Sequence, residues 1–89
     1  MIVLLHRSAE KYLGRLQSAD RERFDAAFND LEQEPPEGDI KPYEGSPGVL
    51  RLRVGNYRAI FKYVDNHILV THIEPRGQAY KKKTRTKRG

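Results

Sequence analysis

The stretch LRLRVGNYRAIF, residues 50–61, constrains the fold of this chain more than any other segment. Its residues alternate between apolar and polar on both sides of Gly55–Asn56, a dipeptide typical of a two-residue hairpin turn. In such a hairpin Arg53 lies directly opposite Arg58, and Arg51 points to the same side of the sheet. Like charges directly opposite one another destabilise a sheet. A fold tolerates this arrangement more readily if an anion occupies the space between the arginines.

The rest of the chain predicts one mixed domain. Apolar residues recur at helical spacing within residues 9–16 and again within residues 24–31, which indicates a helical hairpin. The segment 35–48 is too rich in Pro and Gly for a helix or an inner strand. Strands are expected at residues 2–5, 49–54, 57–64 and 67–74. We therefore predict an α+β fold, with an N-terminal strand and a two-helix hairpin packed on a mainly antiparallel sheet of about four strands.

The hairpin register assigns side chains to the two faces of this sheet. The face expected to receive the helices is apolar and holds Leu50, Leu52, Tyr57, Ala59, Phe61, Tyr63, Ile68 and Val70. The other face is cationic at one end and apolar in the middle, and it holds Arg51, Arg53, Arg58, Ile60, Lys62, Leu69, Thr71 and Ile73. Because a one-residue slip swaps the two faces of a strand, both assignments depend on the positions of the hairpin turns.

The charge of the chain is unevenly distributed. Residues 1–44 contain 6 Lys/Arg and 10 Asp/Glu, whereas residues 45–89 contain 11 and 2, so the net charge of +5 comes from the second half. Such clustering is typical of a protein that binds a polyanion, although a basic tail that only aids solubility is the alternative. We expect one domain at residues 1–80 and a flexible basic tail at residues 81–89.

Several classes of site and location are disfavoured. The chain has no cysteine, so no disulfide framework or thiolate metal site is expected, and its three histidines do not share a face in the predicted register. No metal and no cofactor are therefore expected. The apolar opening MIVLLH is too short for a signal peptide or a membrane span, which favours a cytoplasmic protein without membrane contact.

The candidate site gathers around the opposed arginines. Arg51, Arg53 and Arg58 share a face, and the last strand ends near Pro75, so that Arg76 and Tyr80 can return beside them. Guanidinium groups suit phosphate oxygens, and a tyrosine ring can stack on a base, which together indicate a phosphodiester site. The alternative is that the arginines are ordinary solvent-facing charges.

The span GSPGVLRLRVGNYRAIFKYVDNHILVTHIEPRGQAY, residues 45–80, resembles the RelE side of the RelE/ParE toxin superfamily. LRLRVGNYRAIF is the most specific part, and EPRGQAY corresponds to a terminal segment with an arginine and a tyrosine. With the N-terminal strand and the helices, the resemblance covers nearly the whole chain apart from the tail. It implies a toxin that cleaves messenger RNA in the ribosomal A site, without a metal, and that a cognate antitoxin neutralises.

The resemblance also implies roles for five residues. Arg51 and Arg53 match two basic strand residues that are lysines in the best-studied members, and Arg58 matches an arginine that holds phosphate. Arg76 matches a residue thought to protonate the leaving oxygen, and Tyr80 matches a tyrosine that stacks on or orients the nucleotide. The expected further contacts to messenger and 16S ribosomal RNA are Lys62, Lys81, Lys82, Lys83 and Arg85.

The general base is missing from this pattern. Arginine stays protonated, with a pKa above about 12, so Arg51 and Arg53 are poor bases for the ribose 2′-hydroxyl. The position before the last arginine, often histidine in the family, is Pro75 here. Glu44 is the nearest carboxylate in sequence, and the other acceptors are ribosomal groups or water.

Two other functions are kept as alternatives. A ParE-like inhibitor of DNA gyrase would use the same scaffold, but that branch generally lacks the basic cluster with a terminal tyrosine. A non-catalytic relative would bind RNA or ribosomes and leave messenger intact, and the arginines at lysine positions favour it. It would bind ribosomes with a steep salt dependence.

Overall fold

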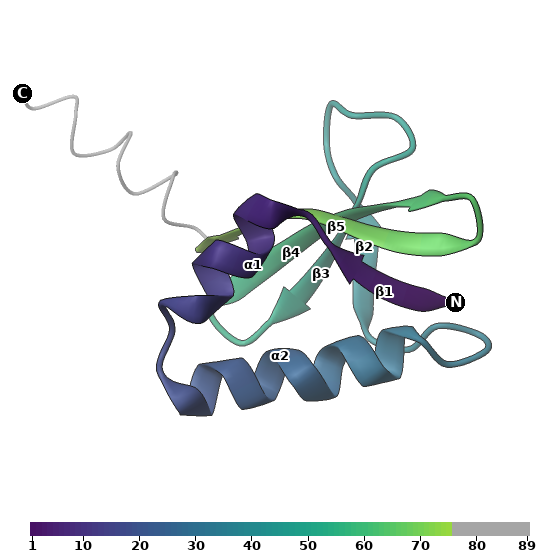
Figure 1. Ribbon diagram of the computed structural model, residues 1–89. Helices are drawn as coiled ribbons and strands as arrows, with labels where there is room; N and C mark the ends of the chain where they lie inside the picture. The colour runs from purple at the N-terminus through teal and green to yellow at the C-terminus, as the bar shows by residue number, and fades with distance from the viewer. Residues whose placement is uncertain (76–89) are drawn as a thin grey trace, which may run out of the picture.

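Five strands and two helices make up the computed structural model, which describes residues 1–75 (Figure 1). The chain begins with strand β1 (Ile2–Leu5), continues through helices α1 (Arg7–Gly14) and α2 (Ser18–Leu31), and then enters the rest of the sheet. The remaining strands are β2 (Asp39–Pro42), β3 (Leu50–Val54), β4 (Tyr57–Val64) and β5 (His67–Pro75). The predicted tail at residues 81–89 lies outside the described residues.

The five strands form one sheet in the order β1-β5-β4-β3-β2. β1 runs parallel to β5, and every other neighbouring pair is antiparallel. The predicted α+β class is confirmed, but the sheet has five strands where about four were expected. The additional strand, β2, lies in the Pro- and Gly-rich segment and at the edge of the sheet, where Pro42 does not interrupt a ladder on both sides.

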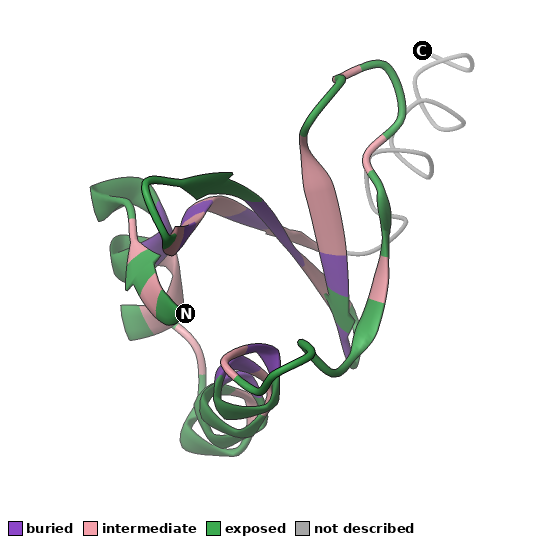
Figure 2. Ribbon diagram, turned by 90° about the vertical axis from the view of Figure 1, so that its right-hand side faces the viewer, coloured by how far each residue is buried: buried purple, intermediate pink, exposed green. Residues whose placement is uncertain are grey.

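Both helices cover the same face of the sheet. Phe24, Phe28 and Leu31 of α2 are buried in one cluster with strand residues such as Leu52 and Phe61. Figure 2 shows the buried residues of α2 turned toward the buried parts of the strands. Removing this apolar area from water stabilises the fold by about 25 cal/mol per Å², so the helices are held by packing. The opposite face is left free for the arginines.

The β3–β4 hairpin has the predicted register. Arg53 pairs with Arg58 and Arg51 pairs with Ile60, which confirms both assignments. Gly55 has φ +58°, a left-handed conformation that glycine adopts at little cost, at the first central position of the turn. The second hairpin turn, Asp65–Asn66, also has positive φ at both residues, as expected for a two-residue turn.

The register is irregular where β4 meets β5. Phe61 pairs with Val70 and Ile60 with His72, so one extra residue, Thr71, is inserted into β5. The Thr71 hydroxyl donates to the Ile60 carbonyl, with 3.2 Å between the oxygens. All residues after this bulge are on the opposite face from the one that a regular strand would give them.

The bulge corrects one predicted assignment. Ile73 was expected beside the arginines, but it pairs with Ala59 and is 5% exposed within the core. In exchange, His72 and Glu74 are on the face of Arg58. Among the helices formed by residues 1–75, none is both long enough and apolar enough to cross a membrane.

Candidate functional site

A row of four charged residues crosses the free face of the sheet. Asp39 on β2 pairs with Arg53 on β3, Arg53 pairs with Arg58 on β4, and Arg58 pairs with Glu74 on β5. The signs along the row are negative, positive, positive and negative. The destabilising contact between the two arginines is thus flanked by a carboxylate on each side.

Asp39 neutralises the β3 side of the row. Its Oδ1 lies 3.4 Å from Arg51 Nη1, and its Oδ2 lies 3.8 Å from Arg53 Nη1. Arg51 also donates to the Asp39 carbonyl at 3.1 Å. The Asp39 and Arg53 side chains are 44% and 40% exposed, and ion pairs this exposed contribute about 0–1 kcal/mol each. These contacts hold both arginines in place and leave Arg53 open to a ligand, whereas the Arg51 side chain is only 16% exposed.

Glu74 neutralises the β5 side of the row. Arg58 Nη2 donates to Glu74 Oε2, and the two side chains are 31% and 22% exposed. His72 Nε2 lies 3.3 Å from Glu74 Oε1. Arg58 Nε is buried and has no hydrogen-bond partner among the described residues. Arg58 therefore has one N–H engaged by a carboxylate and another that is unsatisfied.

Tyr43, in the loop after β2, lies over this part of the site. Its ring centroid is 5.9 Å from Arg58 Cζ and 6.5 Å from the His72 ring, which it meets edge-on at 79°. Its hydroxyl donates to Glu74, at 3.3 Å from Oε1 and 3.4 Å from Oε2. Burial raises the pKa of Tyr43, and the Glu74 carboxylate raises it further. Tyr43 therefore remains a protonated donor at neutral pH.

A polar hollow of about 420 Å³ opens beside these residues. It is lined by Lys41, Pro42, Tyr43, Glu44, Arg51 and Arg58. Binding sites for small ligands begin at about 300 Å³, so the hollow is large enough for a phosphate with part of its nucleotide. Three of the six lining residues are cationic, which favours an anionic group there.

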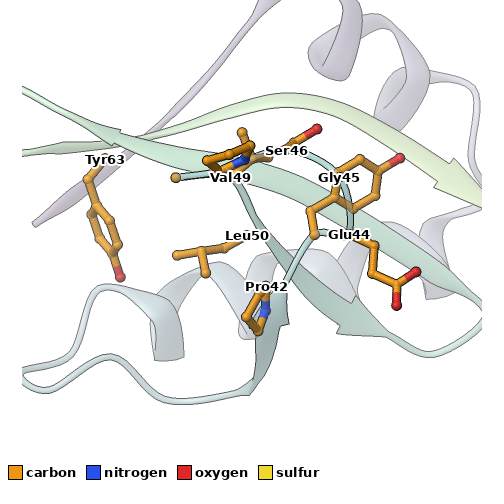
Figure 3. A pocket seen from close by; sticks show the side chains of 10 residues that line it. Pro42, Glu44, Gly45, Ser46, Val49, Leu50 and Tyr63 are labelled. Carbon is orange, nitrogen blue, oxygen red and sulfur yellow. The ribbon is translucent and has the colours of Figure 1, made fainter.

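A second hollow, of about 680 Å³, is separate from the arginines (Figure 3). It lies between the β2–β3 loop and Tyr63, with Val49 and Leu50 between them. Figure 1 shows that this loop projects away from α2. The described residues that line this hollow include no Lys or Arg, so it lacks the groups that would hold a phosphate.

The predicted site residues fall into three groups: the arginines of the hairpin, Lys62, and the residues after position 75. The structure brings Arg51, Arg53 and Arg58 together on one face, whereas Lys62 is exposed further along β4, opposite Leu69. The other predicted residues, Arg76, Tyr80, Lys81, Lys82, Lys83 and Arg85, lie outside the described residues. Within residues 1–75, no three His, Cys, Asp or Glu side chains come together as metal ligands.

Four neighbours of the arginines were not predicted: Asp39, Tyr43, His72 and Glu74. A regular register gives Glu74 and His72 the opposite face, and nothing in the sequence around Thr71 indicates the bulge. Asp39 and Tyr43 come from the segment interpreted as a connection.

Comparison with known proteins gives the family. A family model described as the ParE toxin of the type II toxin–antitoxin system parDE matches residues 3–80. The chain is a toxin of the RelE/ParE superfamily. This confirms the resemblance seen in the sequence. No curated protein matches the chain.

Solved structures of this superfamily have the same fold as this toxin. The archaeal RelE–RelB complex from Pyrococcus horikoshii OT3 contains a chain that is 32% identical, with a TM-score of 0.70 over 86% of this chain and 96% of that one. The RelB–RelE antitoxin–toxin complex from Methanococcus jannaschii matches at 22% identity, with a TM-score of 0.70 and coverage of 89% and 96%. The isolated E. coli RelE toxin matches at 18% identity, with a TM-score of 0.69 and coverage of 96% of both chains. The last two likenesses concern the fold alone.

Proposed function

We propose that this toxin is a ribosome-dependent endoribonuclease that cleaves messenger RNA in the A site. The observation that supports it most is the meeting of Arg51 and Arg58 at one polar hollow, with Arg53 beside them in the hairpin register. Guanidinium groups bind phosphate oxygens in pairs and stay charged at any physiological pH. A toxin that only binds a protein target has no need to place two arginines at such a hollow.

The proposed reaction is attack of a ribose 2′-hydroxyl on the adjacent phosphate. The bond from O2′ to phosphorus forms, the bond from phosphorus to O5′ breaks, and the proton lost at O2′ is balanced by one gained at O5′. Arg51 and Arg58 would stabilise the charge on the five-coordinate phosphorus, for which each well-placed donor is worth about 3–4 kcal/mol. By family resemblance, Arg76 would protonate O5′ and Tyr80 would orient the nucleotide.

The acceptor of the 2′-proton is the open part of this mechanism. Three carboxylates lie near the arginines, but Asp39 is paired with Arg51 and Arg53, and Glu74 is engaged by Arg58 and Tyr43. Glu44 lines the hollow, is exposed, and forms no ion pair within residues 1–75. We assign charge stabilisation and orientation to the toxin, and the proton to a ribosomal group or water.

A cognate antitoxin is the proposed protein partner. Two of the similar structures are complexes of RelE with RelB, which supports such a partner for this chain. Several large apolar side chains near the β1 edge are unusually exposed, with Ile2 at 61% and Leu4 at 46%. Exposed apolar surface of this kind is typical of a protein–protein interface.

The experiment that tests the function is messenger cleavage on programmed ribosomes, mapped by toeprinting. Wild-type toxin should produce discrete A-site cuts, and Arg58→Ala should reduce the cleavage rate at least about a hundredfold, as expected for a lost transition-state donor. The matched control is Arg21→Ala, because Arg21 is exposed on α2, which covers the other face of the sheet. Equal loss in both variants, or equal cleavage by both, would contradict the assignment of the site.

Gyrase inhibition is the second candidate function. The matching family model is described as a ParE toxin, which favours it. It predicts DNA cleavage complexes in a gyrase assay and no cuts in messenger. A non-catalytic relative is the third, favoured by the carboxylates that neutralise the arginines, and it predicts ribosome binding with messenger left intact.

A further inference from the structure

We propose that Glu74 is an internal counter-ion that an RNA phosphate must displace from Arg58. The inference rests on the proposed function, because it concerns how RNA reaches the same arginines. In the free protein, Arg58 Nη2 donates to the Glu74 carboxylate, which occupies the place that a phosphate oxygen would take. RNA binding then exchanges one carboxylate for one phosphate at this guanidinium.

The position of Glu74 is specific. It is the direct cross-strand partner of Arg58, placed there by the extra residue Thr71 in β5. Its two carboxylate oxygens are contacted by three side chains, those of Arg58, Tyr43 and His72. A carboxylate and a phosphate present similar acceptor oxygens to a guanidinium, so one can substitute for the other.

The ion pair is accessible to a ligand. The side chains of Arg58 and Glu74 are 31% and 22% exposed, and Arg58 lines the polar hollow. A partly exposed pair is weaker than a buried one and can be opened without unfolding the sheet. The exchange frees only the Oε2 side of Glu74, because Tyr43 and His72 both contact Oε1. The displaced carboxylate therefore keeps partners after Arg58 has turned to the phosphate.

The exchange favours ligands that carry several phosphates, such as an RNA strand, over single anions. A small anion that displaces Glu74 gains one guanidinium and exposes one carboxylate, which leaves little net gain. An RNA strand places its neighbouring phosphates near Arg51 and Lys41 at the same time, and these contacts add to the one at Arg58. Glu74 thereby selects for a chain of phosphates.

The experiment measures binding of a short single-stranded RNA with 2′-O-methyl groups, which cannot be cleaved, to the full-length toxin by fluorescence anisotropy. Glu74→Gln removes the competing charge, so we expect about three- to fivefold tighter binding near 100 mM salt. The plot of log affinity against log salt should also become steeper by up to about 0.7, the value for one phosphate of a single strand. Tyr43→Phe should instead weaken binding, since it removes a hydroxyl that stabilises the displaced Glu74 carboxylate.

The matched control is Glu22→Gln, which makes the same chemical change on α2, away from the arginine face. Charges beyond about 10 Å are largely screened at this salt, so affinity should change less than about 1.5-fold. If Glu74→Gln binds no more tightly than Glu22→Gln, or if Tyr43→Phe binds more tightly than wild type, the exchange is wrong while the proposed function stands. If the wild-type toxin binds no RNA, both are wrong. A thermal melt of each variant shows that it is folded.

Discussion

Arg53 on β3 and Arg58 on β4 are direct cross-strand partners although both are positively charged. The arrangement persists because Asp39 lies next to Arg53 and Glu74 next to Arg58, so each positive charge has a negative neighbour on its outer side. The sheet thus holds two guanidinium groups together at its centre by placing carboxylates on the flanking strands. The same carboxylates limit how strongly the arginines attract a polyanion.

Removing Asp39 should expose the repulsion between the arginines. Asp39→Ala is expected to lower the free energy of unfolding by about 1 kcal/mol, because it loses the ion pairs to Arg51 and Arg53 and leaves like charges uncompensated. The difference should shrink in high salt, which screens both effects. Urea unfolding at low and high salt measures it, with Asp25→Ala on the exposed side of α2 as the control. A loss that does not depend on salt would exclude an electrostatic cause.

The bulge at Thr71 can be tested through the residue that it moves into the core. Ile73→Ala should lower the free energy of unfolding by about 2–4 kcal/mol, because Ile73 is 5% exposed among packed side chains. Leu69→Ala, at a half-exposed position before the bulge, should cost about 1 kcal/mol or less. Urea unfolding of the two variants gives the comparison. A regular β5 would place Ile73 on the same face as Leu69, and the two losses would then be similar.

Much of the fold could be predicted from the sequence because local turn chemistry determines register. Gly55–Asn56 and Asp65–Asn66 are short turns that leave one pairing for the strands beside them. The first pairing is present throughout, and the second holds from the turn to Phe61 and Val70. The helices followed from apolar periodicity in the same way. The additional edge strand β2 was missed, because the chemistry of a Pro-rich edge strand resembles that of a loop, and Ile73 was given the wrong face because of the bulge in β5.

The site was less predictable because its carboxylates depend on irregular features. No Gly or Pro near Thr71 indicates a bulge, and a regular strand would place Glu74 on the face of the helices, so its contact with Arg58 was not predicted. Asp39 and Tyr43 come from a segment whose path cannot be deduced from periodicity. The three arginines were found since they lie within one hairpin. Their catalytic roles, and those of Arg76 and Tyr80, stay predictions.

The toxin should lose stability in alkali above about pH 10. Burial, together with Asp20 at Tyr57 and Glu74 at Tyr43, raises the pKa of Tyr12, Tyr43 and Tyr57 above the ordinary value of 10.0. Because the folded pKa values are the higher ones, the stabilisation is complete below pH 10 and is lost as pH rises through them. Unfolding free energies between about pH 8 and 12 should show this fall, and Tyr57→Phe should make it shallower. A pH dependence that Tyr57→Phe leaves unchanged would exclude Tyr57 as a contributor.

Substituting Glu44 tests whether the toxin supplies the general base for the 2′-hydroxyl or relies on a ribosomal group or water. Glu44→Gln should change the A-site cleavage rate less than about threefold, because an exposed carboxylate at the rim of the hollow is not needed for charge stabilisation. Single-turnover cleavage across a pH series measures it, with Glu37→Gln, also exposed, as the control. A loss of about a hundredfold or more, with the acidic limb of the pH profile removed, would identify Glu44 as the general base. In that case the arginines at the lysine positions would be explained by a carboxylate that has taken over proton removal.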